Sequence, residues 1–178
     1  MDIFFQQLIN GLVLGSIYAL VALGYTMVYG IMGLINFAHG EVVMIGALTA
    51  LSVIKLLQGS GLPGPLIVVI GLLVAMPVCM AVGFTVERVA YRPLRYAPRL
   101  APLITAIGVS IVLQQLALLF WGRNYHTFPS LLPSVPHTVL GASITDLQVL
   151  IIVLAAAIMA GLMLLVNTTR LGSAMRAT

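Results

Sequence analysis

Residues 65–86 read PLIVVIGLLVAMPVCMAVGFTV and contain no charged side chain. As an α-helix this stretch would be about 33 Å long, which is enough to cross the hydrocarbon core of a bilayer. The rest of the chain has a similar composition, because 61% of its 178 residues are hydrophobic and 7% are charged. Soluble domains carry roughly 25% charged residues. The composition therefore argues against a cytosolic enzyme, a DNA-binding module and a disordered chain, and predicts an integral membrane protein.

Four long apolar runs and one short run predict an all-α, polytopic bundle of about five transmembrane helices, with no second domain. The long runs cover residues 8–29, 65–86, 100–121 and 147–166. The short run, residues 42–54, lies between Glu41 and Lys55 and would be only about 20 Å long as a helix. Since it is too short to cross a bilayer alone, it must be extended upstream.

The extended segment, residues 31–57, reads IMGLINFAHGEVVMIGALTALSVIKLL and is predicted to be a broken second helix. The extension draws four residues to membrane depth: Asn36, His39, Gly40 and Glu41. A carboxylate at the centre of a bilayer costs about 2.5 to 3.5 kcal/mol, so Glu41 needs a partner or water. We expect non-helical backbone from Gly30 to Asn36, followed by a half-helix that Asn36 caps.

Two interpretations of this element are open. In one, the polar residues only tie the break to a neighbouring span. In the other, they shape the substrate pathway and its gate, where free N–H groups of the half-helix receive a substrate carboxylate. Ser110 and Gln114 share one face of the fourth span, because they are four residues apart. We expect them to bond to other helices or to line the pore.

The basic residues predict the orientation of the chain in the membrane. Six of them flank the third and fifth spans on what would be one side: Arg88, Arg92, Arg95, Arg99, Arg170 and Arg176. Only Lys55 and Arg123 would lie on the other side. Because Lys and Arg collect on the cytoplasmic side, we expect the N-terminus outside and the C-terminus inside. The arginines are interpreted as membrane-edge anchors, with binding of anionic lipid or a nucleotide as the alternative.

The sequence contains no pattern typical of catalysis. It has no Ser/His/Asp set, no phosphate-binding loop and no metal-ligand cluster, so we expect no enzyme activity, no catalytic or metal-binding residue and no cofactor in this chain. His126 and His137 are not expected to bind a metal. Small residues spaced by four predict close helix packing: Gly11, Gly15 and Ala19 in the first span, and Gly71, Ala75, Cys79 and Gly83 in the third.

Four motifs resemble one known family in the same order along the chain. They are the stretch 11–46 (which contains INFAHGE), VERVAYRPLR at 86–95, LITAIGVSIVLQ at 103–114 and TRLGSAMRAT at 169–178. They are similar to the Liv-type permease subunits of branched-chain amino acid ABC importers, and the first two together are quite specific. Residues 1–178 are then expected to be a transmembrane permease domain, the N-terminal portion of a longer permease.

The resemblance implies a bacterial inner-membrane subunit that pairs with a related permease subunit. Its further partners would be two ATP-binding subunits, which use the ATP, and an extracytoplasmic solute-binding protein that delivers leucine, isoleucine or valine. Nucleic acid is not an expected partner, whereas membrane lipid is. The segment that couples the permease to the ATPase would begin at four residues: Arg170, Leu171, Gly172 and Arg176.

Three other functions are also compatible with the sequence. Permeases for urea or short-chain amides carry a similar pattern, so the substrate is not fixed by the motifs. An ion-coupled secondary carrier that uses Glu41 as a proton or cation site is a second possibility. A truncated fragment that does not transport is the third.

Overall fold

The computed structural model describes residues 2–33, 36–94, 96–98, 100–131, 135–139, 142–169 and 172, with the backbone alone at 2, 31–32, 138–139 and 142. The chain forms two compact units. One consists of Met1–Gly33 with Leu132–Thr178, and the other of Leu34–Leu131.

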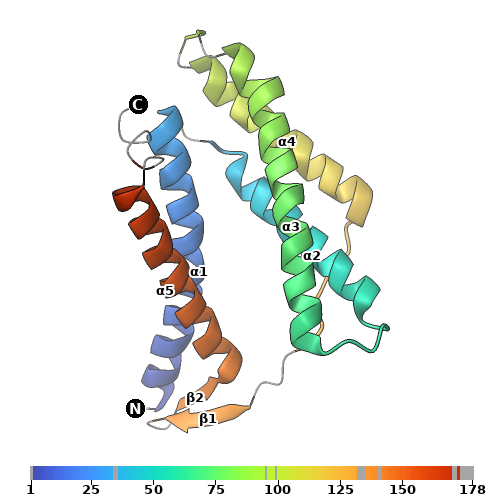
Figure 1. Cartoon of the computed structure of the whole chain (residues 1–178), viewed down its shortest axis with the longest axis vertical. Helices are drawn as coiled ribbons and strands as arrows, with labels where there is room; N and C mark the ends of the chain where they lie inside the picture. Colours follow the sequence, from blue (N-terminus) through green and yellow to red (C-terminus); the bar gives the residue numbers. More distant parts are fainter. Residues whose placement is uncertain are drawn as a thin grey trace. The chain divides into compact units, whose positions relative to one another are not determined.

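The first unit pairs two long helices with a short hairpin. Helices α1 (Asp2–Met32) and α5 (Asp146–Thr168) lie side by side, and the antiparallel strands β1 (Pro136–Val139) and β2 (Ala142–Thr145) lie at the end that carries the N-terminus (Figure 1). Gln6 of α1 holds the hairpin, because its side chain donates to the Ser143 carbonyl (3.1 Å) and accepts from the Ser143 N–H (2.9 Å). The sequence did not predict this hairpin.

The second unit contains three long helices, α2 (His39–Leu57), α3 (Gly64–Val86) and α4 (Leu100–Trp121). A π-helical turn, η1 (Glu87–Tyr91), and a 3₁₀ turn, η2 (Arg92–Leu94), follow α3 directly. Helix α2 packs against both α3 and α4 (Figure 1). All three lie in one sequence-continuous unit, which therefore holds the predicted pathway residues.

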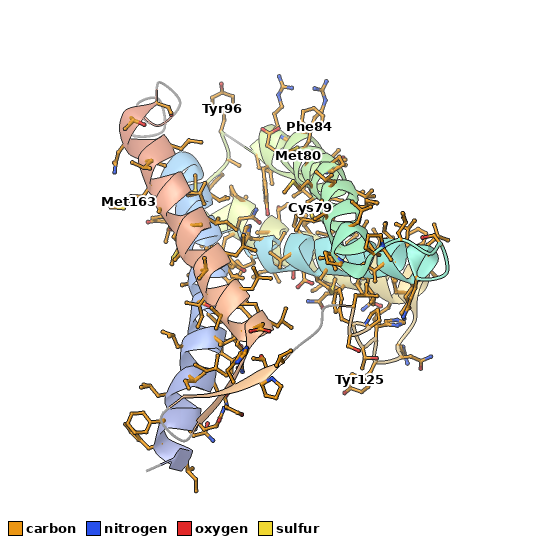
Figure 2. All side chains as sticks on the ribbon, turned by 60° about the horizontal axis from the view of Figure 1, so that its bottom comes forward. Cys79, Met80, Phe84, Tyr96, Tyr125 and Met163 are labelled. Carbon is orange, nitrogen blue, oxygen red and sulfur yellow. The ribbon has the colours of Figure 1, made fainter. Side chains whose placement is uncertain are left out.

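Small residues allow α2 and α3 to approach closely. A Cβ atom added at Gly46 would lie 2.6 Å from the sulfur of Cys79, and one added at Gly71 would lie 3.3 Å from the Ala50 carbonyl oxygen. Figure 2 labels Cys79 on α3, together with Met80 and Phe84, whose side chains are exposed. The packing role predicted for the small residues of the third span is confirmed for Gly71 and Cys79, whereas a Cβ atom at Gly83 would meet nothing within 4 Å in the described part of the chain.

The glycines of the first span behave differently. A Cβ atom at Gly11 or Gly15 would meet no atom within 4 Å in the described part of the chain. Many large apolar side chains on the helices are exposed as well, for example Leu119 at 78%. Such surfaces fit an environment of lipid or of other membrane subunits rather than water.

The described residues form five helices that are long and apolar enough to cross a membrane, which confirms the predicted all-α class. The break ahead of the second helix lies further along the chain than expected, between Met32 and His39. Gly30, predicted to be non-helical, still belongs to α1, which ends at Met32; Gly33 follows with φ +63° and donates its N–H to the Tyr29 carbonyl (2.8 Å). Only glycine adopts this left-handed conformation at little cost, so it marks the end of the helix. Helix α2 is continuous from His39.

Candidate functional site

A small apolar core fixes the beginning of α2 between the other helices of its unit. Ala38, Ile45 and Leu113 are buried together, and Val82, Val86 and Val109 are among the side chains packed against them. Ala38 is fully buried, at 0% exposed, and directly precedes the first residue of α2. This packed apolar core therefore holds the polar residues around Ala38 in place.

Glu41 lies in the first turn of α2, and its carboxyl group receives two hydrogen bonds from α4. Ser110 Oγ donates to Glu41 Oε1 at 3.0 Å, and Gln114 Nε2 donates to the same oxygen at 2.7 Å. Ser110 stands halfway along the 22 residues of α4, so the carboxyl group sits beside the middle of a membrane-spanning helix. Hydrogen bonds to a charged group are roughly twice as strong as neutral ones, and a carboxylate at this depth needs such donors.

The expected bonding of Ser110 and Gln114 to another helix is confirmed by these contacts. An acidic side chain in the first turn also interacts favourably with the positive end of the helix dipole. His39 and Gly40 precede Glu41 in the same turn and are half-buried. Two N–H groups at this helix start, those of Ala38 and His39, already donate to Asn36.

Asn36 does not cap α2, contrary to expectation. The helix begins at His39, and Ala38 occupies the cap position without a side-chain cap. Instead, Asn36 Oδ1 accepts from the Ala38 N–H (3.0 Å) in a local turn, and its carbonyl accepts from the His39 N–H (3.1 Å). An asparagine whose side-chain oxygen accepts the backbone N–H two residues further on forms an Asx turn, which competes with true capping.

A second contact of Asn36 comes from a residue that the sequence did not single out. The hydroxyl group of Tyr91, in η1, donates to Asn36 Oδ1 at 2.6 Å. The two residues are 55 positions apart, and Tyr91 sits inside the arginine-rich motif that was interpreted as a membrane-edge anchor. A tyrosine among arginines at a helix end is the only sequence signal that points to it.

The far end of α2 is also joined to α4 by polar contacts. Trp121 Nε1 donates to Ser52 Oγ at 2.7 Å. His126 lies with one ring nitrogen 3.5 Å from Lys55 Nζ and the other 2.9 Å from the Trp121 carbonyl oxygen. Helix α2 is thus fixed to α4 at both ends. Among the described residues, no group of three His, Cys, Asp or Glu side chains could hold a metal ion.

Of the predicted coupling residues, Gly172 is described, whereas Arg170, Leu171 and Arg176 lie outside the described residues. The Gly172 N–H donates to Thr169 Oγ1 at 3.2 Å. Its α-carbon lies so close to the backbone of Val166 that a Cβ atom would collide with it. Glycine is therefore required at this position in the observed conformation.

Residues 7–178 match the model of a family described as the permease component of branched-chain amino acid transport systems. The chain belongs to this family. It is 48% identical to the high-affinity branched-chain amino acid transport system permease protein BraD of Pseudomonas aeruginosa. It is 45% identical to the protein of the same description, LivH, of Escherichia coli strain K12, and 44% identical to LivH of Salmonella typhimurium. Each alignment covers 98% of this chain and 58% of the relative.

The chain spans 58% of the length of these curated relatives. A comparison with solved structures found no match. Membership in a permease family agrees with the five apolar helices, so the chain is a multi-pass membrane protein. The family resemblance predicted from the four motifs is confirmed.

Proposed function

We propose that this chain is part of the permease subunit of an ABC importer that moves leucine, isoleucine or valine into the cell, while separate subunits hydrolyse ATP. The observation that carries this proposal is the 44 to 48% identity over 98% of the chain to permeases named for branched-chain amino acid transport. The relatives are transport permeases, and we propose that this chain likewise performs no chemistry and holds no cofactor of its own.

The proposed setting is the bacterial inner membrane, with the N-terminus outside and the C-terminus in the cytoplasm. The basic residues after α3 support this orientation, because Lys and Arg collect on the cytoplasmic side. The Arg88 guanidinium group lies 5.8 Å from the centre of the Phe84 ring, an arrangement suited to a helix end at the membrane surface. The proposed partners are a related permease subunit, two ATP-binding subunits and an extracytoplasmic solute-binding protein.

We assign the substrate pathway and its gate to the polar residues around the start of α2. They are Asn36, His39, Gly40, Glu41, Ser110 and Gln114. Non-helical backbone at membrane depth is tolerated where it lines a cavity or is buried in protein, and the Asn36 turn ahead of α2 fits that requirement. Gly172, with Arg170, Leu171 and Arg176, would begin the segment that couples to the ATPase.

Reconstitution of the full-length permease with its partner subunits and solute-binding protein tests the proposal. Proteoliposomes should accumulate labelled leucine only when ATP is present on the side of the ATP-binding subunits. Uptake that persists without those subunits and follows a proton or sodium gradient would identify an ion-coupled carrier and overturn the proposal. Competition by urea or acetamide, but not by valine, would overturn the assignment of the substrate.

A further inference from the structure

We infer that Tyr91 is a positioning residue for the Glu41 site: through Asn36, its hydroxyl group sets the start of α2 and so aligns the Glu41 carboxyl group with its donors on α4. This inference depends on the proposed function only in the experiment that measures leucine uptake. Every residue in the chain of contacts lies within the unit Leu34–Leu131.

The hydrogen bond between Tyr91 and Asn36 is short and partly buried. Tyr91 is 8% exposed, and its hydroxyl lies 2.6 Å from Asn36 Oδ1. The same oxygen accepts the N–H of Ala38 at 3.0 Å, so both of its lone pairs are occupied. Asn36 is half-buried, so removing the tyrosine hydroxyl would leave one lone pair of its amide oxygen without this donor and would lose the stabilisation that the bond contributes.

The position of the hydroxyl is set by an unusual backbone. Tyr91 is the last residue of the π-helical turn η1, where the Arg92 N–H bonds to the Glu87 carbonyl, five residues back. This turn continues α3 and also packs against α4. An extra residue in one helical turn redirects the side chains that follow it, and such turns are frequent at functional sites. Here the turn coincides with the tyrosine that reaches the segment before α2.

The contact is close enough to Glu41 to control its alignment. Ala38, which bonds to Asn36, is three residues before Glu41, less than one helical turn. Ala38 is also fully buried against Ile45 and Leu113, so its position defines where the first turn lies. A shift of that turn would move the carboxyl group away from Ser110 and Gln114, which both contact a single oxygen.

Hydrogen–deuterium exchange of the full-length permease in its assembled complex tests the positioning without any need for transport. Tyr91→Phe should speed amide exchange in a peptide that covers residues 38–42 by about 3- to 10-fold, the factor expected for one lost hydrogen bond. Peptides from the C-terminal half of α2 should exchange as in the wild type. Asn36→Leu should copy this pattern, whereas Asn36→Asp, which keeps an acceptor oxygen, should not. Unchanged exchange at 38–42 in Tyr91→Phe overturns the inference.

A double-mutant cycle in the leucine uptake assay then separates positioning from a purely structural role. Tyr91→Phe alone should lower the initial uptake rate by about 3- to 10-fold. In a Gln114→Leu background, where Glu41 has already lost its shorter contact, the same change should lower uptake less than twofold. Multiplicative effects of the two changes would mean that Tyr91 does not act through Glu41, and would overturn the inference.

The neighbouring tyrosine supplies the matched control. Tyr96 is 97% exposed and stands clear of the ribbon (Figure 2), so Tyr96→Phe should change neither exchange at 38–42 nor uptake. If the wild-type complex takes up no leucine, the proposed function fails, while the exchange experiment still decides whether Tyr91 sets the start of α2.

Discussion

Gln114 Nε2 lies 2.7 Å from Glu41 Oε1, so a side chain near the middle of α4 donates to a carboxyl group in the first turn of α2. Ser110, one turn away on α4, donates to the same oxygen. A carboxylate at this depth is costly unless it is paired, and ionisable side chains within membrane spans mark substrate or ion pathways. The two donors orient the group while the chain keeps an ionisable side chain in a membrane-spanning region.

The Gln114 contact should matter for transport. Gln114→Leu removes the shorter of the two bonds to Glu41 and should lower ATP-dependent leucine uptake by about tenfold, as expected for a hydrogen bond to a charged group. Gln115→Leu is the matched control, because Gln115 is the adjacent glutamine on the same helix and, among the residues that the structure describes, Glu41 receives its side-chain bonds from Ser110 and Gln114. Equal uptake rates in the two variants would contradict a role for the Glu41 site.

The crossing of α2 and α3 should tolerate no side chain at Gly46. Gly46→Ala places a methyl group 2.6 Å from Cys79 Sγ and should destabilise the protein by about 1 to 3 kcal/mol through overpacking. Thermal unfolding in detergent measures this loss. Adding Cys79→Ala removes the sulfur and should restore most of the stability. A double variant as unstable as Gly46→Ala alone would show that the sulfur is not what limits the approach.

The hairpin should depend on Gln6. Its side chain makes two bonds to the backbone of Ser143, one in each direction, so Gln6→Leu releases β2 from α1. Limited proteolysis of the purified protein should then cut within residues 135–145 several-fold faster, about the factor for one or two lost hydrogen bonds. Gln7→Leu, at the next and exposed position, serves as the control. Equal cleavage of both variants would argue that other contacts hold the hairpin.

The helices could be predicted because a long uncharged segment in lipid has few alternatives to a membrane-spanning helix. Helix α4 covers Leu100–Trp121 as expected, since an uncharged run bounded by polar residues has one way to span a bilayer. The end of α1 was less predictable. Gly30 and Gly33 look alike in sequence, and only the positive φ at Gly33 distinguishes them. Strands of four residues, as in the hairpin, are too short for their alternation to stand out.

The site could be predicted in part. Glu41 stood out because hydropathy alone cannot place a carboxyl group there, and the spacing of Ser110 and Gln114 put them on one face of a helix. That these three residues meet depends on how α2 packs against α4, which spacing within each helix does not determine. Tyr91 was missed for the same reason, because its bond to Asn36 joins positions 55 residues apart through a π turn.

Thiol accessibility tests most directly whether the Glu41 site lies on the substrate pathway. The chain has one cysteine, so Cys79→Ala followed by Ser110→Cys gives a single reporter beside Glu41 in this part of the permease. In the full-length importer, a membrane-impermeant methanethiosulfonate reagent should modify the reporter, because reaction requires water that ionises the thiol. Leucine-loaded solute-binding protein with ATP should change the modification rate several-fold. Ile111→Cys, at the adjacent position, which is 53% exposed on the apolar helix surface, should react far more slowly. A reporter at position 110 that stays as unreactive as the one at 111, with and without leucine and ATP, would contradict the account.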